Sequence, residues 1–176
     1  MNLQGKKCLI AYFSRKGNNY SRGSIVNLPI GNTEVIAKMV KDLASGDLFR
    51  IDTIKPYPED YGETTEVAGQ ELRSNERPAL LNHVVDMGAY QVVFLGYPNW
   101  WGTMPMAVRT FLEEYDFSGK TIVPFCTHEG SGLGSSIRDI AKLCPRAELV
   151  NAIGFHGTNV KNARKEVESW IQKLQK

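Results

Sequence analysis

The chain has 176 residues, 42% of them hydrophobic, which is enough to form one domain with a substantial core. Lys and Arg number 21 and Asp and Glu 19, and the scattered basic residues form no patch of the kind that binds nucleic acid. No apolar stretch approaches the ~20 residues that a bilayer crossing requires. The three cysteines form no CxxC pair, which favours free thiols in a reducing compartment. We therefore expect a single cytoplasmic domain over 1–176, without a nucleic-acid or membrane partner.

Short apolar runs without polar alternation predict strands that are covered on both faces. We expect such strands at 8–13, 92–97, 122–126 and 149–155. A further segment, 48–54, alternates between an apolar side and a charged side, which predicts a strand at the edge of a sheet.

Apolar residues at 3.6-residue spacing predict helices between these strands. The clearest helix contains Val35 to Leu43; Asn32 or Thr33 can cap its start and Gly46 can end it. Further helices are expected over 61–77, 104–115, 135–143 and 162–174. The alternation of strands and helices predicts an α/β fold, in which a parallel sheet carries helices on both faces. Ligands of such sheets bind beyond the carboxyl ends of the strands, which points to three loops.

The first loop, 14–33, follows the first strand and ends at the N-terminus of a helix. The unpaired N–H groups of a helix N-terminus attract anions, so Ser14, Asn32 and Thr33 can complete a phosphate cradle. Plain helix capping by Asn32 and Thr33 fits the sequence about equally well. Neither GxGxxG nor GxxxxGK[ST] follows the strand, which favours a small phosphate ester over a dinucleotide or a nucleoside triphosphate.

The second loop, 96–105, contains two adjacent tryptophans, Trp100 and Trp101, directly after a buried strand. Consecutive side chains cannot both point into one core, and large aromatic rings are costly to leave in water. We expect at least one ring to face a cleft, where it can stack on a flat aromatic ligand. The alternative is one tryptophan in the core and one that shields a loop.

The third loop, 127–136, is rich in glycine, which allows close approach of the backbone to the hydrogen-bonding edge of a pyrimidine-like ring. An ordinary flexible loop between a strand and a helix fits equally well. His128 and Glu129 could form an acid/base pair, but ionisable residues in a loop are more often solvated than catalytic. We assign no catalytic residue and no metal ligand.

Together these segments resemble the flavodoxin-like family, in a bacterial branch of it. The resemblance covers nearly the whole chain and rests on Ala-Tyr-Phe-Ser-Arg, Gly-Asn-Thr-Glu, Tyr-Pro-Asn-Trp-Trp-Gly and Thr-His-Glu-Gly-Ser-Gly-Leu-Gly-Ser. It implies a doubly wound sheet of five parallel strands in the order 2-1-3-4-5, and one noncovalent FMN. Phosphate binding is implied for Ser14, Asn32 and Thr33. A place beside the flavin ring is implied for Pro98, Asn99, Trp100, Trp101, Gly102, Thr127, His128, Glu129, Gly130 and Gly132.

The chain departs from the family's pattern in three respects. Residues 17–30 look like an insertion into the phosphate loop, which could add ligand contacts or form a flap. Segment 149–155 runs unbroken, unlike the split final strand of long-chain flavodoxins. The net charge of +2 differs from the strongly acidic character that is usual among the electron carriers of the family.

The resemblance implies an FMN redox protein, and we expect electron transfer with a redox partner protein. The alternative is a small NAD(P)H-dependent FMN reductase that acts on quinones or related acceptors. Near-neutral charge weakens the carrier interpretation, because acidic surfaces steer basic partners.

A nonenzymatic signalling domain of the same fold is disfavoured. Its phosphorylation site requires carboxylates after the first strand and an acceptor Asp after the third. The chain has Tyr12-Phe13-Ser14 and Tyr97-Pro98-Asn99 at these places.

Overall fold

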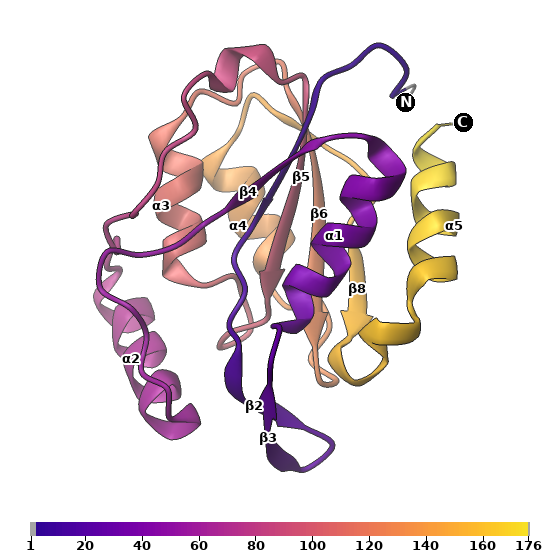
Figure 1. The fold of residues 1–176 in the computed structure, drawn as a ribbon. Coiled ribbons are helices and arrows are strands. Elements are labelled where there is room, and N and C mark those ends of the chain that lie inside the picture. The colour runs from indigo at the N-terminus through magenta and orange to yellow at the C-terminus, as the bar shows by residue number, and fades with distance from the viewer. Residues whose placement is uncertain (1–2, 176) are drawn as a thin grey trace.

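A computed structural model describes residues 3–175 and shows one central sheet with helices on both faces (Figure 1). The main sheet has the order β4-β1-β5-β6-β7, with β8 also paired to β6, and all its pairs are parallel. Its strands are β1 (Cys8–Tyr12), β4 (Asp47–Arg50), β5 (Val92–Pro98), β6 (Thr121–His128), β7 (Glu148–Leu149) and β8 (Ile153–His156).

Helices α1 and α5 pack together on one face of the sheet, and α3 and α4 pack on the other (Figure 1). Helix α2 lies beside the end of the sheet, at the level of a hairpin formed by β2 (Gly17–Ser21) and β3 (Ser24–Leu28). Within residues 3–175, no helix combines the length and the apolar composition that a membrane crossing needs. The helices are α1 (Asn32–Ala44), α2 (Tyr61–Ser74), α3 (Met106–Glu114), α4 (Ser136–Leu143) and α5 (Arg164–Leu174), with short 3-10 turns at Met87–Ala89 and Gly157–Asn162.

The sheet separates two hydrophobic cores, which explains the uninterrupted apolar runs of its strands. Along β5, Val93 and Leu95 belong to the core under α3 and α4, while Val92 and Phe94 belong to the core under α1 and α5. Because successive side chains of a strand point to opposite faces, both faces of β5 must be apolar.

The predicted strand order is confirmed, with one difference at the last strand. Strands β4, β1, β5 and β6 take the places 2-1-3-4, and β7 and β8 together take place 5. The prediction of an unbroken strand over 149–155 is wrong, because the backbone turns left-handed at Asn151 (φ 50°). The Asn151 carbonyl accepts the indole N–H of Trp170 at 2.6 Å, and this contact holds the break between the two pieces.

The prediction that Asn32 or Thr33 caps the start of α1 is wrong. Gly31 occupies the N-cap position without a side-chain bond, and the hydroxyl of Ser14 accepts the Glu34 N–H from outside the helix at 3.1 Å. The left-handed residue at the other end is Ser45 (φ 52°), one position before the expected Gly46. A side chain at Gly46 would instead meet the Cys8 carbonyl, with 2.8 Å between the added Cβ and that oxygen.

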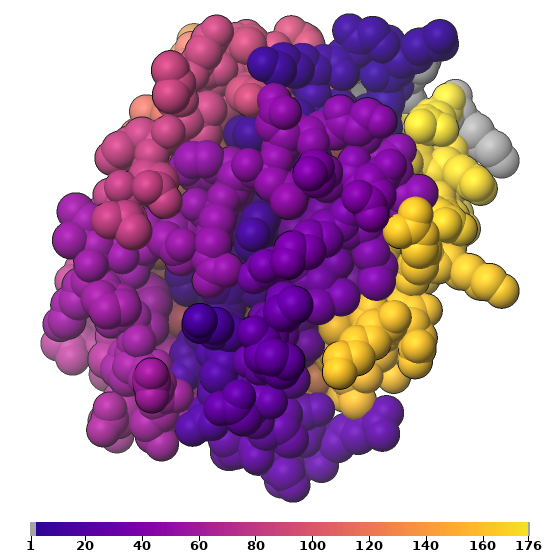
Figure 2. All heavy atoms as spheres, viewed as in Figure 1, coloured from indigo at the N-terminus to yellow at the C-terminus, as the bar shows by residue number. Residues whose placement is uncertain are grey.

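The predicted insertion at 17–30 forms an antiparallel hairpin of β2 (Gly17–Ser21) and β3 (Ser24–Leu28). Arg22 (φ 50°) and Gly23 (φ 82°) make its two-residue turn, and two positive φ values suit the twist of paired strands. The hairpin projects at one end of the molecule, close to α2 (Figure 2).

Candidate functional site

A cavity of about 390 Å³ lies where the carboxyl ends of β1, β5 and β6 meet. This volume falls in the range of small-molecule sites, roughly 300–1,000 Å³. All three loops predicted from the sequence contribute to its wall. The predicted site residues that line it are Ser14, Asn32, Thr33, Pro98, Asn99, Trp100, Trp101, Thr127, His128 and Glu129.

Hydroxyl and amide groups gather at one end of the cavity, which we call the phosphate end and define by Ser14, Asn32, Thr33 and Thr127. The hydroxyls of Thr33 and Thr127 lie 2.8 Å apart, and both residues are buried. The first hydrogen bond of α1 joins the Val35 N–H to the Gly31 carbonyl, so the amides of Asn32 and Thr33 precede the helical bonds. These amides and hydroxyls form a donor set suited to an anion.

The backbone approaches closely at Gly31 of the phosphate end. A Cβ added there would lie 2.2 Å from the Ser14 hydroxyl oxygen and 2.6 Å from the Arg15 carbonyl oxygen. Only glycine fits this contact without a shift of the loop. The two ends of the 14–33 loop are therefore held against each other.

Arg50, at the end of the edge strand β4, supports the phosphate end from behind. Its guanidinium donates to the Ser14 carbonyl at 3.0 Å, to Glu34 at 2.8 Å and to Asp52 at 2.9 Å. These bonds fix both Ser14 and the first turn of α1. The alternation in 48–54 placed Arg50 on the wetter side of a strand, but gave no indication of this supporting role.

The two tryptophans belong to a tight turn on another part of the cavity wall, which we call the ring end and define by residues 98–103. The Trp100 N–H donates to the Thr103 carbonyl at 2.9 Å, and the reverse bond is 3.2 Å. The central residues, Trp101 (φ 54°) and Gly102 (φ 80°), are both left-handed. Such a turn is unusual for a bulky residue, and it aims the two rings in different directions.

Both rings line the cavity, but only one joins the core. Trp100 meets Phe13 and Tyr57 edge-on, with ring centroids 5.2 and 5.1 Å apart. Trp101 is 57% exposed and donates its indole N–H to the Thr65 carbonyl of α2 at 3.0 Å. The structure thus combines the two interpretations of the pair, with one ring packed and one ring available at the cavity wall.

Three predicted glycines, Gly102, Gly130 and Gly132, do not line the cavity but hold its loops. Asn99 accepts the Gly102 N–H at 3.0 Å through its side-chain oxygen and donates to the Gly132 carbonyl at 2.8 Å. The Gly130 N–H donates to Nδ1 of His128 at 3.0 Å. The second and third loops are therefore bonded directly to each other.

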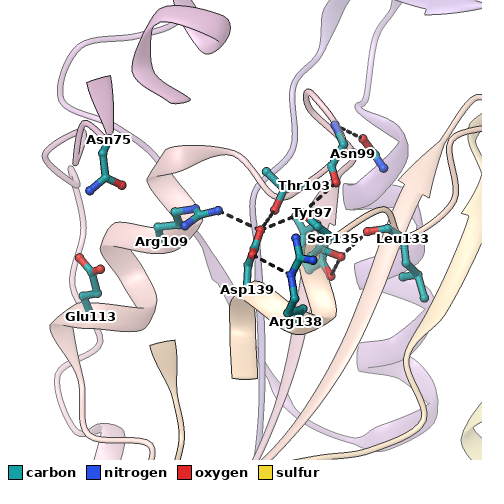
Figure 3. Close-up of polar contacts among 12 residues, drawn as sticks. Asn75, Tyr97, Asn99, Thr103, Arg109, Glu113, Leu133, Ser135, Arg138 and Asp139 are labelled. Atoms are coloured by element: carbon teal, nitrogen blue, oxygen red, sulfur yellow. Dashed lines mark hydrogen bonds and ion pairs between the residues drawn. The ribbon is translucent and has the colours of Figure 1, made fainter. Parts of the chain in front are cut away.

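Asp139 of α4 reinforces the same connection (Figure 3). One carboxylate oxygen accepts hydrogen bonds from Thr103 at 2.7 Å, from Arg109 at 2.9 Å and from Ser135 at 3.0 Å. Burial alone would raise the pKa of Asp139, but the two hydroxyl bonds and the Arg109 charge outweigh it and lower the pKa. The ionised carboxylate thus anchors the ring end to α4.

His128 and Glu129 do not form the acid/base pair considered from the sequence. Glu129 accepts a hydrogen bond from Thr158 at 2.8 Å, and its nearest imidazole is that of His156, at 3.7 Å. The His128 Nδ1 accepts the Gly130 N–H, so a neutral His128 carries its proton on Nε2. Burial and the neighbouring His156 lower the pKa of His128, against the opposing effect of Glu129.

The sequence did not predict that α2 forms a wall of the cavity, whereas ligand contacts were one of the two roles considered for the insertion that forms the hairpin. Tyr61, Thr64, Thr65 and Ala68 share one face of α2, and their spacing agrees with a helix face that meets the cavity. That spacing does not reveal which end of the sheet the helix approaches. The remaining lining residues are Arg15 and Ser131 and, from the hairpin, Asn19 and Tyr20.

Arg15 is the one Lys or Arg among the described residues that line the cavity. Its guanidinium donates to backbone carbonyls of Asn18 in the hairpin and of Pro58 and Glu59 before α2. It therefore joins the hairpin to the segment before α2 and places a positive charge beside the cavity.

The described residues include no group of side chains arranged to bind a metal ion, and their cysteines are buried. Among residues 3–175, no three His, Cys, Asp or Glu side chains are grouped to hold a metal ion. The three cysteines are free and buried, and burial raises the pKa of Cys126 to about 12. This thiol is protonated at neutral pH.

A comparison with models of protein families identifies the family of the chain. The model of the Flavodoxin family matches residues 7–174. A comparison with curated proteins finds no match.

Three solved structures illustrate the similarity of the fold. A candidate flavoprotein from Bacteroides eggerthii is 28% identical with a TM-score of 0.77, over 96% of this chain and 98% of that one. A second candidate flavoprotein, from Bacteroides uniformis, is 26% identical with a TM-score of 0.73, over 96% and 99%. A flavoprotein from Lactobacillus acidophilus, solved in complex with FMN, is 16% identical with a TM-score of 0.64, over 90% and 98%.

Proposed function

This chain belongs to the flavodoxin family, and from that premise we propose that it holds FMN in the cavity and transfers electrons between redox partners. The observation that carries the proposal is that a set of hydroxyl and amide donors suited to a phosphate and an exposed indole ring line the same cavity. FMN has the matching composition, with a phosphate at one end and a flat aromatic ring system at the other.

The phosphate end fits the terminal phosphate of FMN. The Asn32 and Thr33 amides precede the helical hydrogen bonds, the dipole of α1 favours negative charge, and Arg15 adds a cation on the cavity wall. The hydroxyls of Ser14, Thr33 and Thr127 complete the donor set. Arg50 neutralises Glu34 nearby, which lowers the repulsion that the acidic first turn of α1 exerts on a phosphate.

The ring end fits an isoalloxazine. Pro98, Trp100 and Trp101 supply apolar surface, and His128, Glu129 and Ser131 of the third loop line the same cavity. Bonds between Asn99 and Gly132 and between Ser135 and Gly102 keep the two sides at a fixed spacing. Because these walls are already formed, the protein loses little conformational entropy when a planar ring binds between them, which favours tight binding.

Bound FMN supplies one- and two-electron transfer, so the protein needs no nucleophile or catalytic base of its own. The contribution of the chain is to bind the phosphate, to orient the ring, to exclude water from one side of it and to set its reduction potential. Trp101 acts on the potential because an electron-rich ring beside the flavin disfavours added negative charge.

A second candidate function is a small FMN-dependent reductase that takes electrons from NADH or NADPH and reduces quinones. The observation in its favour is the extra wall of the cavity, where Tyr20 of the hairpin and Tyr61 of α2 face each other with centroids 6.4 Å apart. A compact electron carrier has no need of such a wall, whereas a small aromatic acceptor could bind there.

Anaerobic reduction of the FMN-loaded protein, followed by visible absorbance, tests the proposed function. For an electron carrier we expect two resolved one-electron steps and negligible steady oxidation of NADH or NADPH with quinones. A single two-electron step together with rapid nicotinamide oxidation would instead establish the reductase.

A further inference from the structure

Helix α2 contains an unexplained glycine at its centre. Gly69 lies in the interior of α2 (Tyr61–Ser74) and is buried, although glycine is among the least favourable residues inside a helix. Its φ is not positive, so the backbone conformation does not require glycine. The reason must lie in what packs against it.

The indole of Trp101 packs against this glycine. A Cβ added at Gly69 would lie 3.1 Å from Cε2 and 3.2 Å from Cζ2 of Trp101, closer than nearly all real contacts of this kind. Its other close neighbour is the far end of the exposed Arg73, which can move. Glycine thus leaves room for the part of the indole that carries Cε2 and Cζ2 to approach the helix.

A hydrogen bond to the backbone of α2 fixes the orientation of the same ring. The Trp101 Nε1–H donates to the Thr65 carbonyl at 3.0 Å, one helical turn before Gly69. The backbone of Trp101 is left-handed (φ 54°), a conformation that is uncommon for a bulky residue. Contacts of the ring with α2 can stabilise this conformation. Trp101 is nevertheless 57% exposed, and Thr65 and Ala68 line the cavity beside it.

We propose that α2 positions the Trp101 ring for flavin stacking, with Gly69 as the position that leaves room for the indole against the helix and Thr65 as the acceptor that sets its angle. Gly69 and Thr65 are positioning residues that act through Trp101. The inference rests on the proposed function, because the ring is positioned for the flavin of that function.

The variant Gly69→Ala separates positioning from fold stability. Alanine is the better helix former, so the apoprotein should unfold at the same temperature or up to about 4 °C higher. The added methyl group displaces the indole, so FMN and riboflavin should both bind about three- to tenfold more weakly. Gly62→Ala in the same helix, whose added Cβ meets only Asp60, is the matched control and should change neither affinity.

Two further measurements distinguish positioning from a general structural effect. In a Trp101→Phe background the smaller ring leaves room for the methyl group, so Gly69→Ala should change flavin affinity by less than about twofold. In the apoprotein, Gly69→Ala should shift the NMR signal of the Trp101 indole N–H, which is assigned by its loss in Trp101→Phe.

The outcomes separate this inference from the proposed function. Failure of the wild-type protein to bind any flavin would count against the proposed function, while the shift of the indole signal would still support the positioning by α2. Wild-type flavin affinity and an unchanged indole signal in Gly69→Ala would overturn the inference and leave the proposed function intact.

Discussion

The two ends of the cavity are built in different ways. The phosphate end consists of buried hydroxyls and helix amides, with Thr33 and Thr127 bonded to each other and Ser14 held by Arg50. The ring end depends on a left-handed turn and on an indole that is 57% exposed and rests on a neighbouring helix. One end is a fixed polar cradle, whereas the other is an aromatic surface positioned by its surroundings.

This difference predicts two distinct mutational signatures. Changes at the phosphate end should weaken FMN and leave riboflavin, which lacks the phosphate, nearly unaffected. Changes at the ring end should weaken both ligands alike, because both carry the same ring. Equal losses of FMN and riboflavin affinity for changes at either end would show that the two ends do not bind different parts of the ligand.

The largest effect is expected for Gly31→Ala. The added methyl group would lie 2.2 Å from the Ser14 hydroxyl oxygen and 2.6 Å from the Arg15 carbonyl, so the phosphate loop must shift. We expect FMN affinity to fall about 100-fold, equivalent to about 2.7 kcal/mol, and riboflavin affinity to fall far less. Fluorescence titration with each ligand measures both values, and unchanged FMN affinity would show that Gly31 lies away from the phosphate.

A somewhat smaller and equally selective effect is expected for Thr33→Val or Asn32→Ala. Each change removes a polar group from the phosphate end, and a hydrogen bond to a charged group contributes about 1.5–3 kcal/mol. FMN affinity should fall at least about tenfold while riboflavin affinity is retained. Thr110→Val in α3, whose hydroxyl bonds only within its own helix, is the matched control. Equal losses for both ligands would place Thr33 and Asn32 at the ring instead.

Asp139→Asn should weaken the support of the ring end. The change leaves the Arg109 charge unpaired and removes a strong acceptor from Thr103 and Ser135, at a cost of about 1–3 kcal/mol in the free energy of unfolding. Urea denaturation at pH 7 measures this loss.

The pH dependence of this stabilisation follows from the lowered pKa of Asp139. The stabilisation is complete above the ordinary pKa of 3.8 and is lost as the pH falls through the lower value of the folded state. The difference between the wild type and Asp139→Asn should therefore diminish in acid. A difference that stays constant down to the lowest pH at which the protein folds would argue against an ionised Asp139 in the folded state.

The smallest effect on binding is expected for Trp101→Ala. Because the ring is exposed, fold stability should change little, whereas FMN and riboflavin should both bind about three- to tenfold more weakly. Loss of the electron-rich ring should also raise the potential of the second electron. Trp100→Ala, within the aromatic cluster of Phe13 and Tyr57, should instead cost about 3 kcal/mol in the free energy of unfolding. If Trp101→Ala kept the flavin affinity and reduction potentials of the wild type, the Trp101 ring would not contact the flavin.

Sequence reasoning located those parts of the site that follow directly from strand order. Ser14, Trp100 and Thr127 come immediately at or after buried strands, and the carboxyl ends of neighbouring parallel strands must meet at one edge. The apolar runs also identified the strands themselves, because both faces of a central strand are covered.

The remaining features depend on contacts between distant segments, which local patterns do not contain. Helix α2 could be placed in the sequence but not at the cavity, since its packing depends on Trp101, more than 25 residues away. The cap of α1 was misplaced because Ser14 reaches Glu34 from another element. The split of the last strand was missed because Asn151 breaks an otherwise regular apolar run.

The most direct test of the central claim is a titration of the purified apoprotein with FMN and with riboflavin under identical conditions. A phosphate cradle and a ring site in one cavity predict that FMN binds at least about 100-fold more tightly than riboflavin, and that riboflavin still binds measurably. Equal affinity for the two flavins, or no uptake of FMN, would contradict the account.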